Sequence, residues 1–137
     1  MSPTNAIPEP GKTYKISLDG NNQILTATEP QGTVLQPFEN TERQKWKCIN
    51  SDKYGLGFQN VNTHKYLTFT DRGWAAQRDG HWTPESFSFT PLPSGGYQMS
   101  VTLNDGWRNC VSDYENGKYL GCEKTFRRDK PIHLYEV

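Results

Sequence analysis

The fold of this chain is decided by the stretch YGLGFQNVNTHKYLTF, residues 54–69. Leu56 and Phe58 alternate with glycine or polar residues, as on one face of a β-strand. Asn62 and Thr63 follow, and their side chains can bond the local backbone, which favours a turn. Residues 66–69 are again rich in aromatic and β-branched side chains. The pattern predicts a strand, a short turn and a second strand.

The same pattern recurs before and after this stretch, which a single hairpin in an arbitrary β-protein would not explain. Strand, turn and strand are also predicted at residues 14–28 and 97–112, and each hairpin is followed by a short apolar piece. A fourth strand then closes each unit, with Trp46, Phe87 and Ile132 as apolar anchors at near-equal spacing. The chain therefore contains three units of four short strands.

Three such units are too few for a propeller, which needs at least about four blades. We predict an all-β fold, a β-trefoil in which three four-stranded units close on each other with pseudo-threefold symmetry. It would have twelve short strands, a six-stranded barrel and a cap of three hairpins. The predicted single domain spans residues 11–137, with units at about 11–50, 51–92 and 93–137, after an irregular, proline-rich arm at 1–10.

Two segments resemble the ricin-B-type lectins. Gln44-Lys45-Trp46 is similar to their Gln-x-Trp motif, and QNVNTHKYL at 59–67 is similar to their Asn-x-x-Thr-Gly-Lys-Tyr-Leu hairpin. The Gln-x-Trp motif is intact only in the first unit, because Phe87 and Ile132 replace tryptophan in the others. The resemblance implies a non-catalytic carbohydrate-binding domain similar to cytosolic fungal lectins, some of which defend against nematodes or insects.

The composition limits the classes of partner. The chain has 15 basic and 15 acidic residues, so it has no basic field that would attract nucleic acid. No apolar run approaches about 20 residues, so we expect no membrane insertion. No secretory signal pattern is visible, and the cysteine count of three is odd, which together favour a cytoplasmic location with reduced thiols.

The cysteines have different expected roles. Cys48 follows the first anchor and is predicted to be a small buried core residue. Ricin-type units often bridge their second and third strands, and Cys110 and Cys122 lie on comparable strands. The resemblance thus implies that a disulfide could join Cys110 and Cys122, and the sequence alone leaves this open.

The sequence shows no catalytic or metal-binding motif. The three histidines fall in separate turns or units, and His-Glu-x-x-His, Gly-x-Ser-x-Gly and phosphate-loop motifs are missing. Asp71, Asp79 and His81 could be drawn together by their loops, but nothing fixes the spacing that a hydrolytic carboxylate pair needs. We therefore predict that the chain is not an enzyme and needs no cofactor or metal.

Sugar recognition combines an aromatic platform with carboxylates or amides that bind hydroxyl groups. The inner loops of the second unit depart most from what a strand requires, and function concentrates in such loops. Trp82 is expected to be exposed, whereas Trp74 fits a sugar platform and a packed residue at the barrel rim equally well. The predicted main carbohydrate site comprises Asp71, Arg72, Trp74, Asp79, His81 and Trp82.

Other loops offer alternatives. In ricin-type lectins an Asp near the end of a unit's second strand holds sugar hydroxyls, and the third unit offers a secondary candidate site of Asp113, Tyr114, Asn116 and Tyr119. The first unit offers Glu29, Phe38 and Asn40. The expected partners are glycans or glycoproteins, with the sugar and the oligomeric state open. The rival function is a β-trefoil protease inhibitor acting through exposed loops at 29–32 and 78–81, but only a sugar site needs the tryptophan pair.

Overall fold

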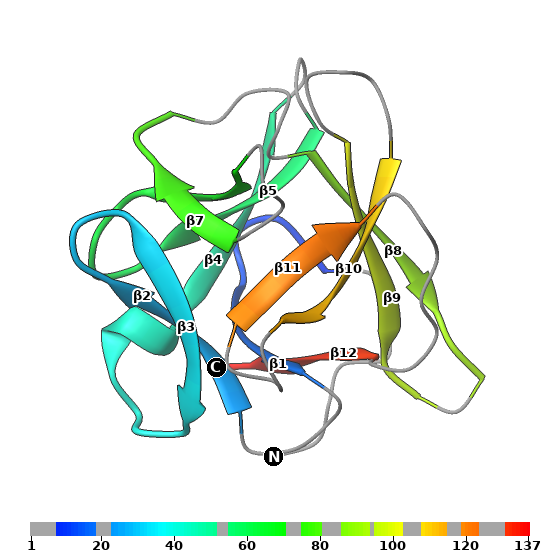
Figure 1. Ribbon diagram of the computed structural model, residues 1–137, viewed down its shortest axis with the longest axis horizontal. Coiled ribbons are helices and arrows are strands. Elements are labelled where there is room, and N and C mark those ends of the chain that lie inside the picture. The colour runs from blue at the N-terminus through cyan, green and yellow to red at the C-terminus, as the bar shows by residue number, and fades with distance from the viewer. Residues whose placement is uncertain are drawn as a thin grey trace.

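The computed structural model describes residues 8–18, 23–51, 55–70, 75–80, 86–93, 95–102, 108–114, 119–123 and 131–137. Within these residues the chain forms twelve short β-strands and one 3-10 turn (Figure 1). The all-β class predicted from the sequence is therefore confirmed. In the same described residues no helix has the length and apolarity needed to cross a membrane.

The strands follow the predicted three groups of four. The first group is β1 (Thr13–Leu18), β2 (Gln23–Thr28), β3 (Gly32–Pro37) and β4 (Trp46–Ser51), with the 3-10 turn η1 (Glu42–Gln44) before β4. The second is β5 (Gly55–Asn60), β6 (Tyr66–Phe69), β7 (Ala75–Arg78) and β8 (Ser86–Pro91). The third is β9 (Tyr97–Thr102), β10 (Arg108–Tyr114), β11 (Tyr119–Glu123) and β12 (Ile132–Glu136).

Antiparallel pairing links the groups into one sheet. The strands expected in the barrel pair as β1–β4, β4–β5, β8–β9, β9–β12 and β12–β1, while β5 and β8 lie close to each other. Hydrogen bonds through β2, β3, β7 and β6 close a ring of seven strands, in the order β1-β2-β3-β7-β6-β5-β4. The twelve strands match the prediction, whereas the six-stranded barrel has no β5–β8 ladder among the described residues.

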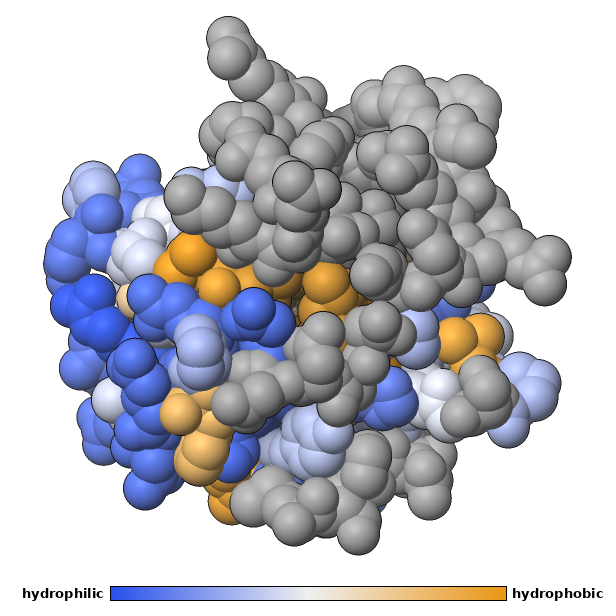
Figure 2. All heavy atoms as spheres, turned by 60° about the horizontal axis from the view of Figure 1, so that its bottom comes forward, coloured by the Kyte–Doolittle hydropathy of each residue, from blue (hydrophilic) through white to orange (hydrophobic). Residues whose placement is uncertain are grey.

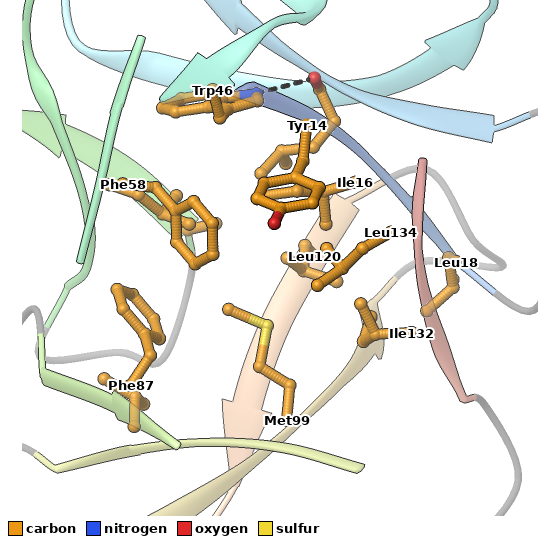
Figure 3. Packing of buried hydrophobic residues seen from close by; sticks show 14 of the residues in the cluster. Tyr14, Ile16, Leu18, Trp46, Phe58, Phe87, Met99, Leu120, Ile132 and Leu134 are labelled. Atoms are coloured by element: carbon orange, nitrogen blue, oxygen red, sulfur yellow. Dashed lines mark hydrogen bonds between the residues drawn. The ribbon is translucent and has the colours of Figure 1, made fainter. Parts of the chain in front are cut away.

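The core is built from alternate residues of strands from all three groups (Figure 3). All three predicted anchors are buried, with exposed fractions of 0% for Trp46, 6% for Phe87 and 0% for Ile132. Phe58 packs against Phe87 with ring centroids 5.8 Å apart. Large aromatic rings supply much of the buried apolar area, which suits a chain with only 33% hydrophobic residues.

The Gln-x-Trp motif holds the first unit together. Trp46 donates its Nε1–H to the Leu25 carbonyl at 3.0 Å, which ties β4 to β2. Gln44 is 0% exposed; its Nε2 donates to the Pro37 carbonyl at 2.8 Å and to Thr26 Oγ1 at 3.1 Å, and its Oε1 accepts from the Glu39 amide at 2.8 Å. The motif therefore has a structural role in this chain.

The structure confirms the prediction for Cys48 and leaves the disulfide between Cys110 and Cys122 untested. Cys48 is a free, fully buried thiol, as expected, and burial raises its pKa to about 12. The backbone register pairs Cys110 with Glu123 and Cys122 with Val111, so the two cysteines are not opposite each other. The side chains of Cys110 and Cys122 lie outside the described residues, and their disulfide stays an open prediction.

Figure 2 shows one face of the molecule, on which the described surface is mainly hydrophilic and apolar residues form small, separate areas. Such scattered apolar area is normal for a protein surface and does not by itself mark a docking site.

Candidate functional site

A hollow of about 510 Å³ opens beside the β6–β7 hairpin of the second unit. Its size lies within the roughly 300–1,000 Å³ of ordinary ligand pockets. The register places Thr68 opposite Ala76 and Tyr66 opposite Arg78, so adjacent parts of the two strands form one wall. The lining residues are Gln31, Thr68, Phe69, Thr70, Ala76, Gln77, Arg78 and Asp79.

A neighbouring turn from the first unit completes this hollow. β3 pairs with β7 at Gly32 and Ala76, and the Gln77 amide donates to the Gln31 carbonyl at 2.7 Å. The side chain of Gln77, only 3% exposed, donates from Nε2 to the carbonyls of Thr28 at 3.0 Å and Gly32 at 2.7 Å. The turn between β2 and β3 is therefore fixed against β7 before any ligand arrives.

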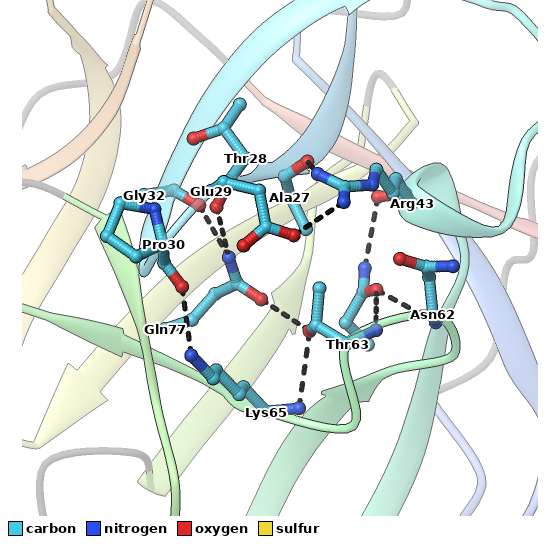
Figure 4. A network of polar contacts seen from close by, with 11 residues as sticks. Ala27, Thr28, Glu29, Pro30, Gly32, Arg43, Asn62, Thr63, Lys65 and Gln77 are labelled. Carbon is cyan, nitrogen blue, oxygen red and sulfur yellow. Dashed lines mark hydrogen bonds and ion pairs between the residues drawn. The ribbon is translucent and has the colours of Figure 1, made fainter.

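The polar network around Gln77 continues on its other side (Figure 4). Thr63 donates its hydroxyl to Gln77 Oε1 at 2.5 Å, and Lys65 Nζ donates to the Pro30 carbonyl at 2.9 Å. The sequence analysis missed Gln77 and Thr63. The available signal was the position of Gln77, which lies two residues after Ala75 and therefore on the same buried face of a short strand, where its side-chain amide needs hydrogen-bond partners.

The predicted sugar-site residues are only partly within the described chain. Asp79 is exposed at the edge of the hollow, directly after β7. Asp71, Arg72, Trp74, His81 and Trp82 lie outside the described residues. Thr70 and Ala75 are the described neighbours of the 71–74 loop, and Gly80 precedes the 81–85 segment. The hollow thus borders both predicted loops in the chain, and the convergence of their side chains stays a prediction.

The secondary candidate site lies at the β10–β11 hairpin. The backbone register places Asp113 opposite Leu120 and Tyr114 opposite Tyr119. Tyr119 is half-buried, Asn116 lies outside the described residues, and for Asp113 and Tyr114 only the backbone is described. The register brings two of the four predicted residues, Tyr114 and Tyr119, to directly opposite positions.

The first unit has a comparable hollow of about 460 Å³. Thr26 lies opposite Val34 in β2–β3 as Thr68 lies opposite Ala76 in β6–β7, and both threonines line their own hollow. Glu29, the carboxylate of this unit, is already paired with Arg43 at 2.6 Å. The lining residues are Thr26, Ala27, Thr28, Glu29, Gln36, Glu39, Thr41, Glu42, Arg43 and Asn62.

The other two candidates of the first unit lie away from this hollow. Phe38 and Asn40 are both exposed, and neither is among the residues that line it. Within the described parts of the chain, no group of three histidine, cysteine, aspartate or glutamate side chains has the arrangement of a metal site.

The chain is similar to known proteins in its three-dimensional structure but not in its sequence. By sequence, neither a protein-family model nor a curated protein matches the chain. The solved structure of SeviL bound to asialo-GM1 saccharide superposes with a TM-score of 0.71 at 15% identity, covering 92% of this chain and 98% of that one. The BEL β-trefoil superposes with a TM-score of 0.74 at 12% identity, covering 99% of this chain and 100% of that one.

A third likeness is to part of a larger protein. The exo-β-1,3-galactanase 1,3Gal43A from Clostridium thermocellum matches with a TM-score of 0.65 at 18% identity, covering 85% of this chain and 28% of that one. These likenesses show that the chain has the β-trefoil fold, as predicted. The resemblance in strand layout that the sequence predicts therefore extends to the three-dimensional fold, which is similar to that of the BEL β-trefoil.

Proposed function

We propose that this chain is a carbohydrate-binding, non-catalytic β-trefoil domain that recognises glycans or glycoproteins through its second unit. The observation that carries the proposal is the hollow beside β6–β7, whose lining includes Thr70, the residue before the 71–74 segment, and Asp79, close in the chain to the 81–85 segment. The structural likeness to SeviL, solved with a bound saccharide, supports the same function.

The proposed site would work by two physical effects. A tryptophan face removed from water against the C–H face of a pyranose contributes on the order of 1–2 kcal/mol, by analogy with aromatic pairs. A carboxylate that accepts sugar hydroxyls contributes roughly 1.5–3 kcal/mol. Trp74 and Trp82 supply the first effect, and Asp71 and Asp79 supply the second, with Arg72 and His81 as further hydrogen-bond donors.

The test begins with a glycan array and continues with titration of the best neutral ligand. Trp74→Ala, Trp82→Ala and Asp71→Ala, made separately, are expected to weaken binding at least about tenfold, since each loses 1.4 kcal/mol or more. If all three stay folded and bind as wild type while Asp113→Ala abolishes binding, the site lies in the third unit instead. No glycan binding together with nanomolar protease inhibition would favour the inhibitor function.

The proposal extends to the symmetry of the fold, the location of the protein and its biological role. The three units are related by pseudo-threefold symmetry, and the β5–β8 contact completes a six-stranded barrel. A cytoplasmic location and a defensive role are carried over from the resemblance to fungal lectins. A subcellular fractionation of the native source would test the location, and a nematode or insect feeding assay would test the role.

A further inference from the structure

Lys15 occupies an unusual place on β1. Tyr14, Ile16 and Leu18 alternate along the strand and belong to the core. Lys15 points to the opposite face of β1, yet its exposed fraction is only 9%. The side chain is covered by Phe38, whose ring centroid lies 3.7 Å from Lys15 Nζ. The lysine is therefore held against an aromatic ring and not extended into water.

No carboxylate among the described residues balances the charge of Lys15. Among the residues that the structure describes, the ion pairs join Lys12 to Glu9 and Glu136 and Arg43 to Glu29, and no carboxylate pairs with Lys15. Loss of hydration lowers the pKa of Lys15, and the nearby Lys45 ammonium lowers it further. Lysine is almost never this buried unless it is paired. Within the described part of the chain, the Lys15 ammonium thus lies near a second cation and has no carboxylate paired with it.

Phe38 completes the features of a binding site. The Lys15 ammonium packs against the Phe38 ring, yet Phe38 remains 41% exposed. Few of the large hydrophobic residues that the structure describes are this exposed. The ring is also held in place, because Gln44 bonds the Pro37 carbonyl and the Glu39 amide on either side of it. The exposed part of the Phe38 ring is open to a ligand, and the Lys15 ammonium lies directly beside that ring.

We propose that Lys15, Lys45 and Phe38 form a second ligand site, which binds an acidic sugar, that is, a pyranose carrying a carboxylate or a sulfate group. The anion supplies the charge that the two ammonium groups lack. The apolar C–H face of the pyranose packs on the exposed part of the Phe38 ring. The site is separate from the first-unit hollow, where Glu29, Glu39 and Glu42 disfavour an anion.

The experiment is a two-dimensional NMR titration of the ¹⁵N-labelled protein with glucuronic acid, glucose 6-sulfate, glucose and inorganic sulfate. We expect the amides of Lys15, Phe38 and Lys45 to shift with the acidic sugars, with sulfate alone binding more weakly and glucose having no effect. The two acidic sugars show whether a carboxylate or a sulfate is preferred. The shifts should diminish as salt rises from low to physiological ionic strength.

Two variants and one matched control test the assignment. Lys15→Met keeps an unbranched, apolar stem without the charge, and Phe38→Leu keeps an apolar side chain without the ring; each should weaken acidic-sugar binding about tenfold. Lys47→Met, at an exposed position on β4, should leave the affinity unchanged. The proposal is wrong if no acidic sugar shifts these amides, or if Lys47→Met weakens binding as much as Lys15→Met does.

The outcome is independent of the proposed function. Trp74→Ala and Trp82→Ala should weaken binding of the neutral glycan at least about tenfold and leave the acidic-sugar shifts at Lys15 intact. If neutral glycans do not bind at all, the acidic-sugar titration still decides the Lys15 site.

Discussion

Gln44 shows how one buried polar side chain can organise a unit with few apolar residues. It satisfies the Glu39 amide, the Pro37 carbonyl and the Thr26 hydroxyl at once. The sequence identified this residue as part of a motif, but the motif alone did not reveal what the amide bonds. That information depends on how the segment after β3 turns back, which no residue period encodes.

Replacing Gln44 with leucine should destabilise the protein by about 2–4 kcal/mol, because the buried Thr26 hydroxyl and the partly buried Glu39 amide and Pro37 carbonyl each lose a partner. The measurement is equilibrium urea unfolding followed by far-UV circular dichroism. Lys47→Ala, on the exposed face of β4, serves as the control and should change stability by less than about 0.5 kcal/mol. A loss below about 1 kcal/mol for Gln44→Leu would mean that water replaces these bonds.

Cys48 gives a prediction for alkaline pH. Burial raises its pKa from 9.0 to about 12, so the native thiol keeps its proton where the unfolded thiol loses it. The unfolded state then binds fewer protons, and stability falls as pH rises above about 9, by up to about 1.4 kcal/mol per pH unit from this group. Cys48→Ala removes this contribution. The stability gap between wild type and Cys48→Ala should therefore narrow between pH 8 and pH 10.5.

That comparison isolates the thiol from other groups. Burial also raises the pKa of Tyr97, but this contribution is common to both proteins and cancels in the difference. Urea unfolding at several pH values provides the two stability curves. A gap that stays constant across this range would show that the buried thiol titrates as it does in the unfolded chain.

The sequence predicted the turn between β5 and β6 but not the residue that makes most of its hydrogen bonds. Asn60 is 0% exposed and accepts from the amides of Asn62 and Thr63 through Oδ1, both at 3.0 Å. Its Nδ2 donates to the Arg43 carbonyl at 3.0 Å. His64 then adopts a φ of 61°, in the left-handed region. The sequence predicted the turn from local hydrogen bonding, and the structure assigns most of that bonding to Asn60.

Asn60→Ala should cost about 2–3 kcal/mol, since two partly buried amides and one partly buried carbonyl lose their partner. Asn62 is exposed in the same turn, and Asn62→Ala is the matched control, expected to lie within about 0.5 kcal/mol of wild type. Urea unfolding of both variants measures the difference. Equal effects of the two substitutions would contradict the assignment and would indicate that turn propensity alone matters.

The bond from Gln77 to Thr28 illustrates what a pass along the sequence cannot find. It joins β7 to the end of β2, positions 49 residues apart. Apolar periodicity predicts which residues of each strand face the core, because that choice is local. It does not predict which neighbouring unit a buried amide will bond, because that depends on packing between units.

The same distinction applies to the assembled trefoil. The three groups of strands, their anchors and the antiparallel hairpins were predictable, since the repeat occurs three times and each copy reinforces the others. The ring of seven hydrogen-bonded strands was not predicted. It depends on the pairing of β3 with β7 at Gly32 and Ala76, and no repeated sequence pattern marks these two positions. The candidate sugar site draws on residues 71–74 and 81–85, whose sequences have no counterpart in the other two units, so the repeat predicts nothing about their arrangement.

The internal repeat also raises the question of valency. The first-unit hollow resembles that of the second unit in position, but its carboxylate Glu29 is engaged by Arg43, which also donates to the Ala27 carbonyl at 3.5 Å. Among the described residues that line it, none is aromatic. A neutral sugar would therefore have to break an ion pair there without gaining a stacking surface. We expect one neutral sugar bound per chain, at the second unit.

Isothermal titration with the best neutral ligand measures this directly, with an expected stoichiometry of about one. Glu29→Gln should leave both stoichiometry and affinity unchanged, because the exposed Glu29–Arg43 pair is worth no more than about 1 kcal/mol to stability and takes no part in binding. Trp82→Ala should instead remove the single binding event. A stoichiometry of two that returns to one in Glu29→Gln would show that the first unit binds sugar, and that its ion pair opens to do so.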